Sequence, residues 1–279
     1  MSLLDCDKLM EDADFLVVGD LIVKSIEESR NTGFGIQHMA IQEEFGGGSA
    51  NACTLQITKS DIYRQLVLID SLYSTNIVRM RQFGIEEIAE DLWNLCADGA
   101  GNHTLATLAK KIDVTKPLPI DVITLFANKY GYIKGAQNKT ATSLISKYLH
   151  FVSLTYPQNV WGFPIYDSIV CELLNKVQKS LRLSITPKRF FNNAATVNIE
   201  MYISSLKGIV DALEQHAPLI WDGKSHLKFE LLDYCLWHIG KAGANSFNLL
   251  LTKSELITYD QMGQLPNRVR MWQNVFSWL

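Results

Sequence analysis

Residues 58–73 have the sequence TKSDIYRQLVLIDSLY, which carries the clearest helical signature in the chain. Thr58 followed by Asp61 three residues later is typical of the N-terminal cap of a helix. Four apolar residues then recur at intervals of three or four, which places them on one face of a helix. These residues are Ile62, Leu66, Ile69 and Tyr73. The stretch therefore predicts a helix with one buried face.

The same periodicity recurs along most of the chain. Further helices are predicted from residue 85 to about 98 and over residues 104–112, 120–130, 138–151, 167–181, 197–213, 227–239 and 267–279. Strand signals are confined to two short apolar runs, at residues 15–18 and 249–252. We therefore expect a mainly α protein with few or no strands.

The glycine run at residues 46–48 predicts a flexible joint between two parts of the chain. On this interpretation an N-terminal segment, residues 1–48, packs on a helical body that comprises residues 49–279. The run lacks the Lys-Ser/Thr pair of a phosphate-binding P-loop, so we do not assign nucleotide binding to it.

The composition of the 279 residues, 47% hydrophobic and 20% charged, is that of a folded protein. No apolar run approaches the roughly 20 residues that a membrane span needs, and the acidic N-terminus lacks a secretory signal. The 5 cysteines are widely spaced, and the 6 histidines form no metal-binding motif. We therefore expect a cytoplasmic protein with reduced thiols, no metal, no cofactor and no membrane association.

The net charge of −3 hides a strong asymmetry along the sequence. Residues 129–189 contain nine basic side chains against two acidic ones, which gives this segment a charge of +7. The rest of the chain contains 17 basic and 27 acidic side chains, a charge of −10. A basic segment on an otherwise acidic protein favours contact with a phosphate backbone, and duplex DNA is the expected partner.

Residues 131–170 contain the motifs that bear on function. Gly135-Ala-Gln-Asn-Lys139-Thr-Ala is a glycine turn that leads into a helix, and Phe163-Pro-Ile-Tyr-Asp167 precedes the next helix. This arrangement resembles the helix-hairpin-helix DNA glycosylase superfamily, in particular its 8-oxoguanine-glycosylase-like branch. Two shorter stretches are similar to members of the same branch. They are Asp70-Ser-Leu-Tyr in the first half of the chain and Leu232-Asp-Tyr-Cys near its end.

The resemblance implies two helical lobes with the active-site segment between them, and a DNA glycosylase with or without Schiff-base lyase activity. Its substrate would be DNA with a modified purine, for instance an oxidised one. A neutral lysine would attack the sugar of a flipped nucleotide, and Asp167 would stabilise the positive charge that develops there. Lys139 matches the lysine at the helix start. Lys147 is the alternative nucleophile because it lies 20 residues before Asp167, whereas Lys139 lies 28 residues before it.

The remaining candidate residues would contact the nucleic acid. The hairpin and the basic segment supply the predicted phosphate contacts, which are Lys134, Gly135, Gln137, Asn138, Lys179, Arg182, Lys188 and Arg189. Tyr156 and Trp161 are candidates to stack on a base, although packing of their loop is the more ordinary role for them.

Two other functions stay open at this point. Gln137 stands where the family has a second hairpin glycine, and the spacing from Lys139 to Asp167 is long. Both features favour a non-catalytic helical module that binds DNA or another protein. A helical interaction protein with no relation to glycosylases is the third possibility.

Overall fold

The computed structural model describes residues 33–46, 54–73, 84–130, 140–156, 158–167 and 198–216, with shorter stretches at 170–171, 174–175, 178, 183–186, 227–233 and 236. Over these residues the protein is mainly α-helical, which confirms the predicted class. The described part contains no strand, only two isolated β-bridges that join Gln56 to Thr104 and Ala97 to His103. The two runs predicted as strands and the helix predicted at 267–279 lie outside the described residues.

Helix α4 (Lys59–Leu72) forms where the capping pair predicts it. The Thr58 hydroxyl oxygen accepts the backbone N–H of Asp61, and the Asp61 carboxylate accepts the backbone N–H of Thr58 at 3.0 Å. This reciprocal capping satisfies two N–H groups that a helix N-terminus leaves without partners. Ile62, Leu66 and Ile69 are completely buried, as the spacing predicts.

The other helices follow in chain order along the described residues. They are α3 (Gly33–Glu44), α5 (Ile85–Leu95), α6 (Leu105–Lys111), α7 (Ile120–Ala127), α8 (Thr142–Leu154) and α10 (Ile199–His216). Residues 170–171, 174–175 and 178 are helical within the predicted helix 167–181, and residues 228–233 are helical within the predicted helix 227–239. The sequence predictions for the first half are therefore confirmed to within a few residues at each end, except that α3 was not predicted.

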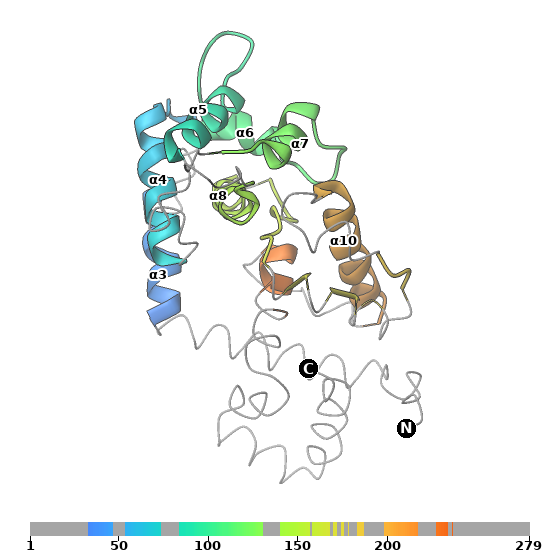
Figure 1. Ribbon diagram of the computed structural model, residues 1–279. Coiled ribbons are helices and arrows are strands. Elements are labelled where there is room, and N and C mark those ends of the chain that lie inside the picture. Colours follow the sequence, from blue (N-terminus) through green and yellow to red (C-terminus); the bar gives the residue numbers. More distant parts are fainter. Residues whose placement is uncertain are drawn as a thin grey trace, which may run out of the picture.

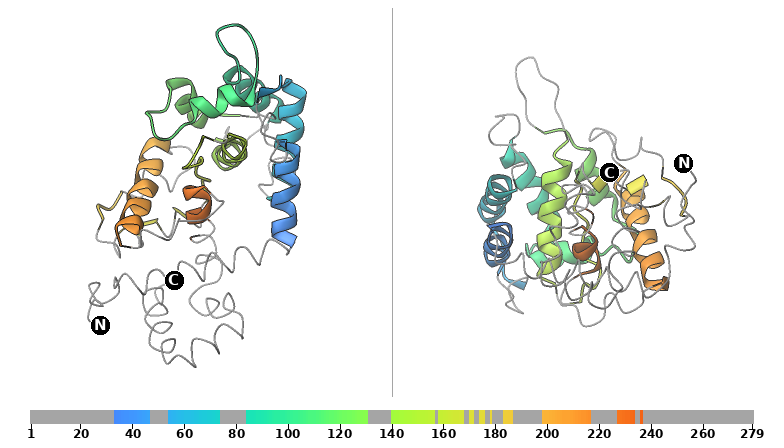
Figure 2. Two further views of the ribbon diagram at one scale, coloured as in Figure 1. Left: turned by 180° about the vertical axis from the view of Figure 1, so that it is seen from behind. Right: turned by 90° about the horizontal axis from the view of Figure 1, so that it is seen from below.

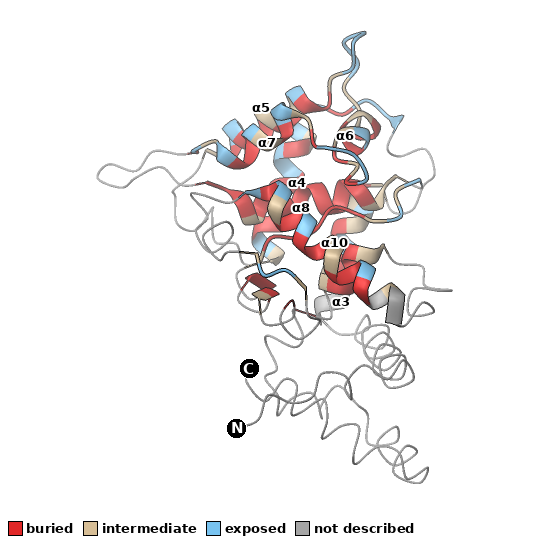
Figure 3. Cartoon of the chain, turned by 90° about the vertical axis from the view of Figure 1, so that its right-hand side faces the viewer, coloured by how far each residue is buried: buried red, intermediate tan, exposed pale blue. Residues whose placement is uncertain are grey.

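Helix α8 lies at the centre of the described structure. Figure 1 shows it almost end-on, with α3 and α4 on one side, α5 to α7 above it and α10 on the opposite side. The reverse view and the view from below show the same arrangement (Figure 2). Eleven of the 13 residues of α8 are buried, so this helix has no exposed face (Figure 3). A helix buried on all sides is normally apolar throughout, which makes the polar residues on α8 the unusual feature of the fold.

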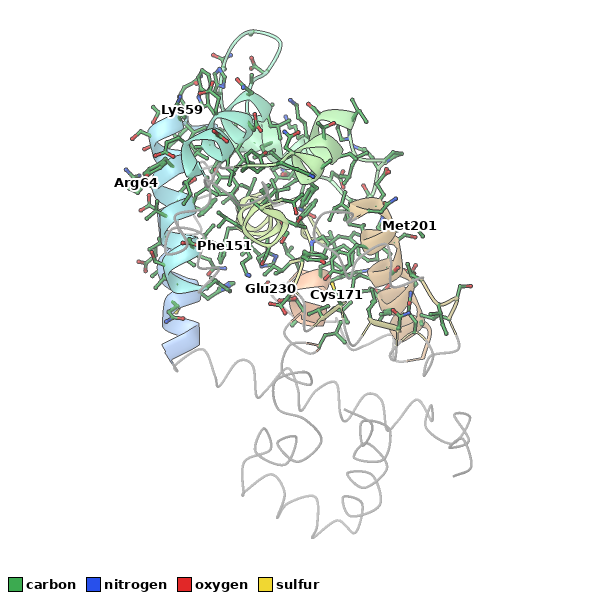
Figure 4. All side chains as sticks on the ribbon, viewed as in Figure 1. Lys59, Arg64, Phe151, Cys171, Met201 and Glu230 are labelled. Carbon is green, nitrogen blue, oxygen red and sulfur yellow. The ribbon has the colours of Figure 1, made fainter. Side chains whose placement is uncertain are left out.

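Aromatic side chains fill the space between α8 and the α3–α4 side. The ring of Phe151 on α8 lies 5.0 Å from that of His38, 5.7 Å from that of Phe45 and 6.0 Å from that of Tyr73. Figure 4 shows Phe151 in this position, between α8 and α4. The packing fixes α3 on the helical body through Ile41 and Phe45, which are 0% and 2% exposed. The predicted boundary at residue 48 lies outside the described residues.

Candidate functional site

Two serines of α8 hold a non-helical segment, Phe163–Asp167, along the length of the helix. The Ser153 hydroxyl donates to the His150 carbonyl and accepts the Phe163 N–H at 3.0 Å. The Ser146 hydroxyl donates to the Ser143 carbonyl and accepts the Tyr166 N–H at 2.9 Å. Each serine therefore donates its hydroxyl hydrogen to a backbone carbonyl of α8. Its hydroxyl oxygen accepts a hydrogen bond from a backbone N–H of the segment.

Two further hydrogen bonds complete this attachment. His150 Nδ1 donates to the Phe163 carbonyl at 2.9 Å, and the Tyr202 hydroxyl of α10 donates to the Ile165 carbonyl at 2.8 Å. Phe163 pairs with the C-terminal half of α8 and Tyr166 pairs with Ser146, so the segment runs antiparallel to the helix. This direction brings Asp167, the next residue, to the turn of α8 that carries Lys147.

Asp167 begins the helix that follows the segment. Its backbone carbonyl accepts the N–H of Cys171 at 2.9 Å, which is the first bond of a helical turn. The sequence placed Asp167 at the N-cap or in the first turn, and the hydrogen bond agrees with that position. The side chain is partly exposed, in contrast to the segment before it.

Lys147 is buried, with only 5% of its surface exposed. Its Nζ donates to the Ser143 hydroxyl at 2.8 Å and lies 5.6 Å from the centre of the Tyr73 ring. Burial lowers the pKa of Lys147 from its ordinary value, while the charges of Asp167, Asp233 and Asp70 act in the opposite direction. Burial is the largest of these effects, so the charged form of Lys147 is less favoured here than in a solvated lysine.

The three carboxylates near Lys147 come from three separate parts of the fold. Asp70 belongs to α4 and is 4% exposed, Asp167 is the last residue of the segment held by α8, and Asp233 lies in the helical stretch 228–233. Burial and the charges of Asp167 and Glu230 raise the pKa of Asp233 to about 8, and the charge of Lys147 opposes them. We call Lys147, Asp70, Asp167 and Asp233 the lysine–carboxylate cluster.

A second group of buried polar side chains adjoins the cluster. His38 Nδ1 lies 3.0 Å from the Tyr73 hydroxyl, and His38 Nε2 lies 3.5 Å from the Glu230 carboxylate. Burial lowers the pKa of His150 to about 4, which makes this imidazole neutral at physiological pH. Glu230 lies below α8 in Figure 4, on the same helical stretch as Asp233. These contacts connect α3, α4 and α8 to the helix that carries Asp233.

The loop before the segment places Trp161 among basic and aromatic side chains. The ring of Trp161 lies 5.3 Å from that of Phe229, and the ammonium groups of Lys228 and Lys207 lie over it at 4.6 and 5.5 Å. Tyr156 is partly buried and packs against the core. Trp161 is thus held by packing and cation–π contacts and Tyr156 by packing, and their predicted stacking on a base stays a prediction.

Most of the predicted DNA-contacting residues lie outside the described residues. They are Lys134, Gly135, Gln137, Asn138, Lys179, Arg182, Lys188 and Arg189, and the same holds for Lys139, the favoured nucleophile. Of the basic residues in 129–189, the structure describes Lys129, which is exposed, and Lys147, which is buried. Lys147 therefore does not belong to a surface that contacts phosphates.

Two members of the cluster were not among the predicted site residues. Asp70 and Asp233 each fall in one of the short stretches that resemble the glycosylase branch, Asp70-Ser-Leu-Tyr and Leu232-Asp-Tyr-Cys. That resemblance was the available signal, but it gave no chemical role to either carboxylate. Their proximity to Lys147 depends on how α4 and the helix at 228–233 pack around α8.

Metal-binding groups and surface hollows are the other features of the described residues that can indicate a binding site. No group of three or more His, Cys, Asp or Glu side chains there could hold a metal ion. A hollow of about 340 Å³ lies between the 114–118 loop and α10, lined in part by Glu200 and Lys207, and no member of the cluster borders it. None of the described helices is both long and apolar enough to cross a membrane.

Comparison of the whole chain with models of protein families, with curated proteins and with solved structures finds no match in any of the three.

Proposed function

We propose that the chain is a DNA glycosylase that removes a modified purine, with Lys147 as the nucleophile and Asp167 as the carboxylate that stabilises the sugar. The observation that carries this proposal is the buried lysine of α8 with carboxylates around it from three parts of the fold. The resemblance of residues 131–170 to the 8-oxoguanine-glycosylase-like branch supplies the reaction class.

The environment of Lys147 suits a nucleophilic amine. An ammonium group is a poor nucleophile, and a lysine attacks carbon only after it has lost its proton. Burial disfavours the charged form and lowers the pKa of Lys147, which raises the share of neutral amine near pH 7. The bond to the Ser143 hydroxyl holds Nζ in one direction, because that bond joins residues one helical turn apart.

Asp167 has the complementary role in this mechanism. As the base leaves, positive charge develops on the sugar, and an ionised carboxylate nearby stabilises it. Asp167 supplies this carboxylate from the start of a helix, where its backbone carbonyl accepts the N–H of Cys171. Attack by Nζ on C1′ then gives a covalent intermediate, which opens to a Schiff base and can eliminate the 3′ phosphate.

We propose Lys147 in preference to Lys139, on the surroundings of Lys147 that the structure describes. Lys139 was favoured because it follows the glycine turn, but it lies outside the described residues. Lys147 directly follows Ser146, whose hydroxyl accepts the Tyr166 N–H next to Asp167, and the charge of Asp167 acts on the pKa of Lys147. Its spacing of 20 residues from Asp167 also agrees with the family pattern.

Borohydride trapping tests this proposal. The full chain is incubated with duplex DNA that contains either an abasic site or an oxidised purine, and sodium borohydride reduces any Schiff base to a stable crosslink. We expect a crosslink with the natural protein and with Lys139→Met, and none with Lys147→Met. Lys110→Met, at an exposed position of α6, is the matched control and should crosslink normally. Thermal unfolding of each variant checks that it is folded.

The alternative is a non-catalytic helical module that binds DNA or a protein. One observation favours it: Lys147 is nearly fully buried and its ammonium already has a hydrogen-bond partner, as a structural lysine would. Absence of a crosslink from the natural protein on both DNA substrates, together with binding to the same DNA, would support this alternative against the enzyme.

A further inference from the structure

One side of α8 presents Lys147 toward the α3–α4 part of the structure. Ser143, Lys147 and Phe151 are four residues apart, so they lie on the same side of the helix, one turn after another. The Ser143 hydroxyl accepts a hydrogen bond from Lys147 Nζ at 2.8 Å, and the ring of Phe151 lies 6.0 Å from that of Tyr73. This side of α8 therefore meets Tyr73 at the turns that carry the lysine.

Tyr73 is the C-cap residue of α4, and its ring lies against the lysine. Its backbone N–H donates to the Ile69 carbonyl at 2.9 Å, which holds the backbone of Tyr73 at the end of the helix. Lys147 Nζ lies 5.6 Å from the centre of the Tyr73 ring, within the distance at which an aromatic face attracts a cation. This attraction is stronger when the cation is withdrawn from water, and Lys147 is 5% exposed. The Tyr73 ring is therefore one of the groups that set the position of the amine.

A histidine from a third helix contacts the hydroxyl end of the Tyr73 ring. Nδ1 of His38 on α3 lies 3.0 Å from the Tyr73 hydroxyl, and the ring of His38 lies 5.0 Å from that of Phe151. On its other side, His38 Nε2 lies 3.5 Å from the Glu230 carboxylate. The Tyr73 ring is thus held at both ends, by α4 through its backbone and by His38 at its hydroxyl.

We propose that Tyr73 is a positioning residue for the Lys147 amine, and that His38 holds the Tyr73 ring where it contacts that amine. The Ser143 hydroxyl fixes one N–H of Lys147, and the ring face supplies a second contact from a different helix. Because α3 lies within the predicted N-terminal segment, residues 1–48, that segment shapes the site through His38. The inference rests on the proposed function for its role in catalysis, but the contacts themselves belong to the free protein.

Loss of the ring should change Lys147 in a defined direction. An aromatic face stabilises the ammonium more than the neutral amine, so removal of the ring should lower the pKa of Lys147 further. The strength of a cation–π contact corresponds to a shift of about 0.4 to 1.5 pH units. The charges of Asp70, Asp167 and Asp233 also act on Lys147, and they are the same in the natural protein and in a Tyr73 variant. The difference between the two proteins therefore reports the ring.

A pH titration of Lys147 in the full chain, without DNA, tests the proposal. Lysine is labelled with ¹³C and ¹⁵N, and nuclear magnetic resonance follows the Lys147 Nζ signal, which is identified by its absence from Lys147→Met. Tyr73→Leu should lower the pH of the Lys147 titration by about 0.4 to 1.5 units. Tyr63→Leu, at an exposed position of α4, is the matched control and should leave it unchanged. An unchanged titration in folded Tyr73→Leu would overturn the proposal.

The role of His38 is tested by combining its variants with those of Tyr73. His38→Ala should lower the pH of the Lys147 titration by less than Tyr73→Leu does, because the ring stays but loses its contact with His38. His38→Gln should keep the natural value, since an amide can bond to the Tyr73 hydroxyl. In Tyr73→Leu, His38→Ala should add no further shift. An equal shift in both backgrounds would overturn the proposal, because His38 would then act on Lys147 without Tyr73.

Tyr73→Phe keeps the test decisive if Tyr73→Leu does not fold. This variant retains the ring and loses the hydroxyl, so it should reproduce the shift of His38→Ala, and no shift in either variant would overturn the proposal. Borohydride trapping adds a catalytic readout, in which His38→Ala should crosslink more slowly than His38→Gln. Lys147 titrates whether or not the protein is an enzyme. Failure of the natural protein to crosslink would therefore count against the proposed function alone, and the titration would still decide the roles of Tyr73 and His38.

Discussion

The buried imidazole of His150 makes the stability of the protein depend on pH in a way that can be calculated. Burial lowers the pKa of His150 from 6.5 to about 4 in the folded protein. Between pH 6.5 and about pH 4 the unfolded chain binds a proton at His150 that the folded protein does not bind. The free energy of unfolding therefore falls as the pH falls through this range. From pH 7.5 to pH 4 the loss attributable to His150 is about 3 kcal/mol, at 1.36 kcal/mol for each unit of pKa difference.

The assay compares urea unfolding of the natural protein and of His150→Asn at pH 7.5 and at pH 4. Asparagine can place its side-chain N–H near the position of Nδ1, so it can keep the bond to the Phe163 carbonyl without titrating. Other acid-sensitive groups, among them Asp61, Asp98 and Asp113, are present in both proteins and cancel in the difference. The natural protein should lose about 3 kcal/mol more than the variant on acidification. Parallel losses in the two proteins would show that His150 is not a buried neutral group.

Three more predictions follow from the cap, the segment and the charge asymmetry. Thr58→Ala removes the reciprocal cap of α4 and should lower the free energy of unfolding, measured with urea, by about 1 kcal/mol. An unchanged free energy of unfolding would mean that the cap is not formed in solution. Ser146→Ala leaves the Tyr166 N–H without its acceptor and should lower the free energy of unfolding by about 1–3 kcal/mol. It should also reduce borohydride trapping more than the control Ser60→Ala, which changes an exposed position of α4. If the basic segment contacts DNA, affinity should fall steeply with salt and with charge reversal, whereas binding that is insensitive to salt would contradict this contact. The residues to reverse are Lys179, Arg182 and Arg189.

The helices were largely predictable from the sequence because local signals specify them. In α4 the capping pair and the apolar period agree with each other, and the helix forms within one residue of the prediction. Helix α3 was not predicted because it begins with Gly33 and Gly35, which disfavour a helix. Its apolar residues also do not recur at helical spacing on one face. Tertiary packing stabilises it instead, through His38, Ile41 and Phe45.

The candidate site was predictable only in part, since it depends on contacts between distant segments. Spacing along the chain gave Lys147 as an alternative to Lys139 but could not show that the Phe163–Asp167 segment runs antiparallel to α8. That direction comes from the hydroxyls of Ser146 and Ser153, which have no motif of their own. In the same way, nothing local to Asp70 or Asp233 indicates that α4 and the helix at 228–233 bring them to one lysine.

The most direct test of the account is to locate the crosslinked residue. The natural protein is trapped with borohydride on duplex DNA that contains an abasic site, digested with protease and nuclease, and examined by tandem mass spectrometry. The account predicts a single modified residue, Lys147, within the peptide that contains Ser143 and Ser146. A crosslink on Lys139 or on another lysine, with Lys147 unmodified, would contradict the claim that the buried amine of α8 is the nucleophile.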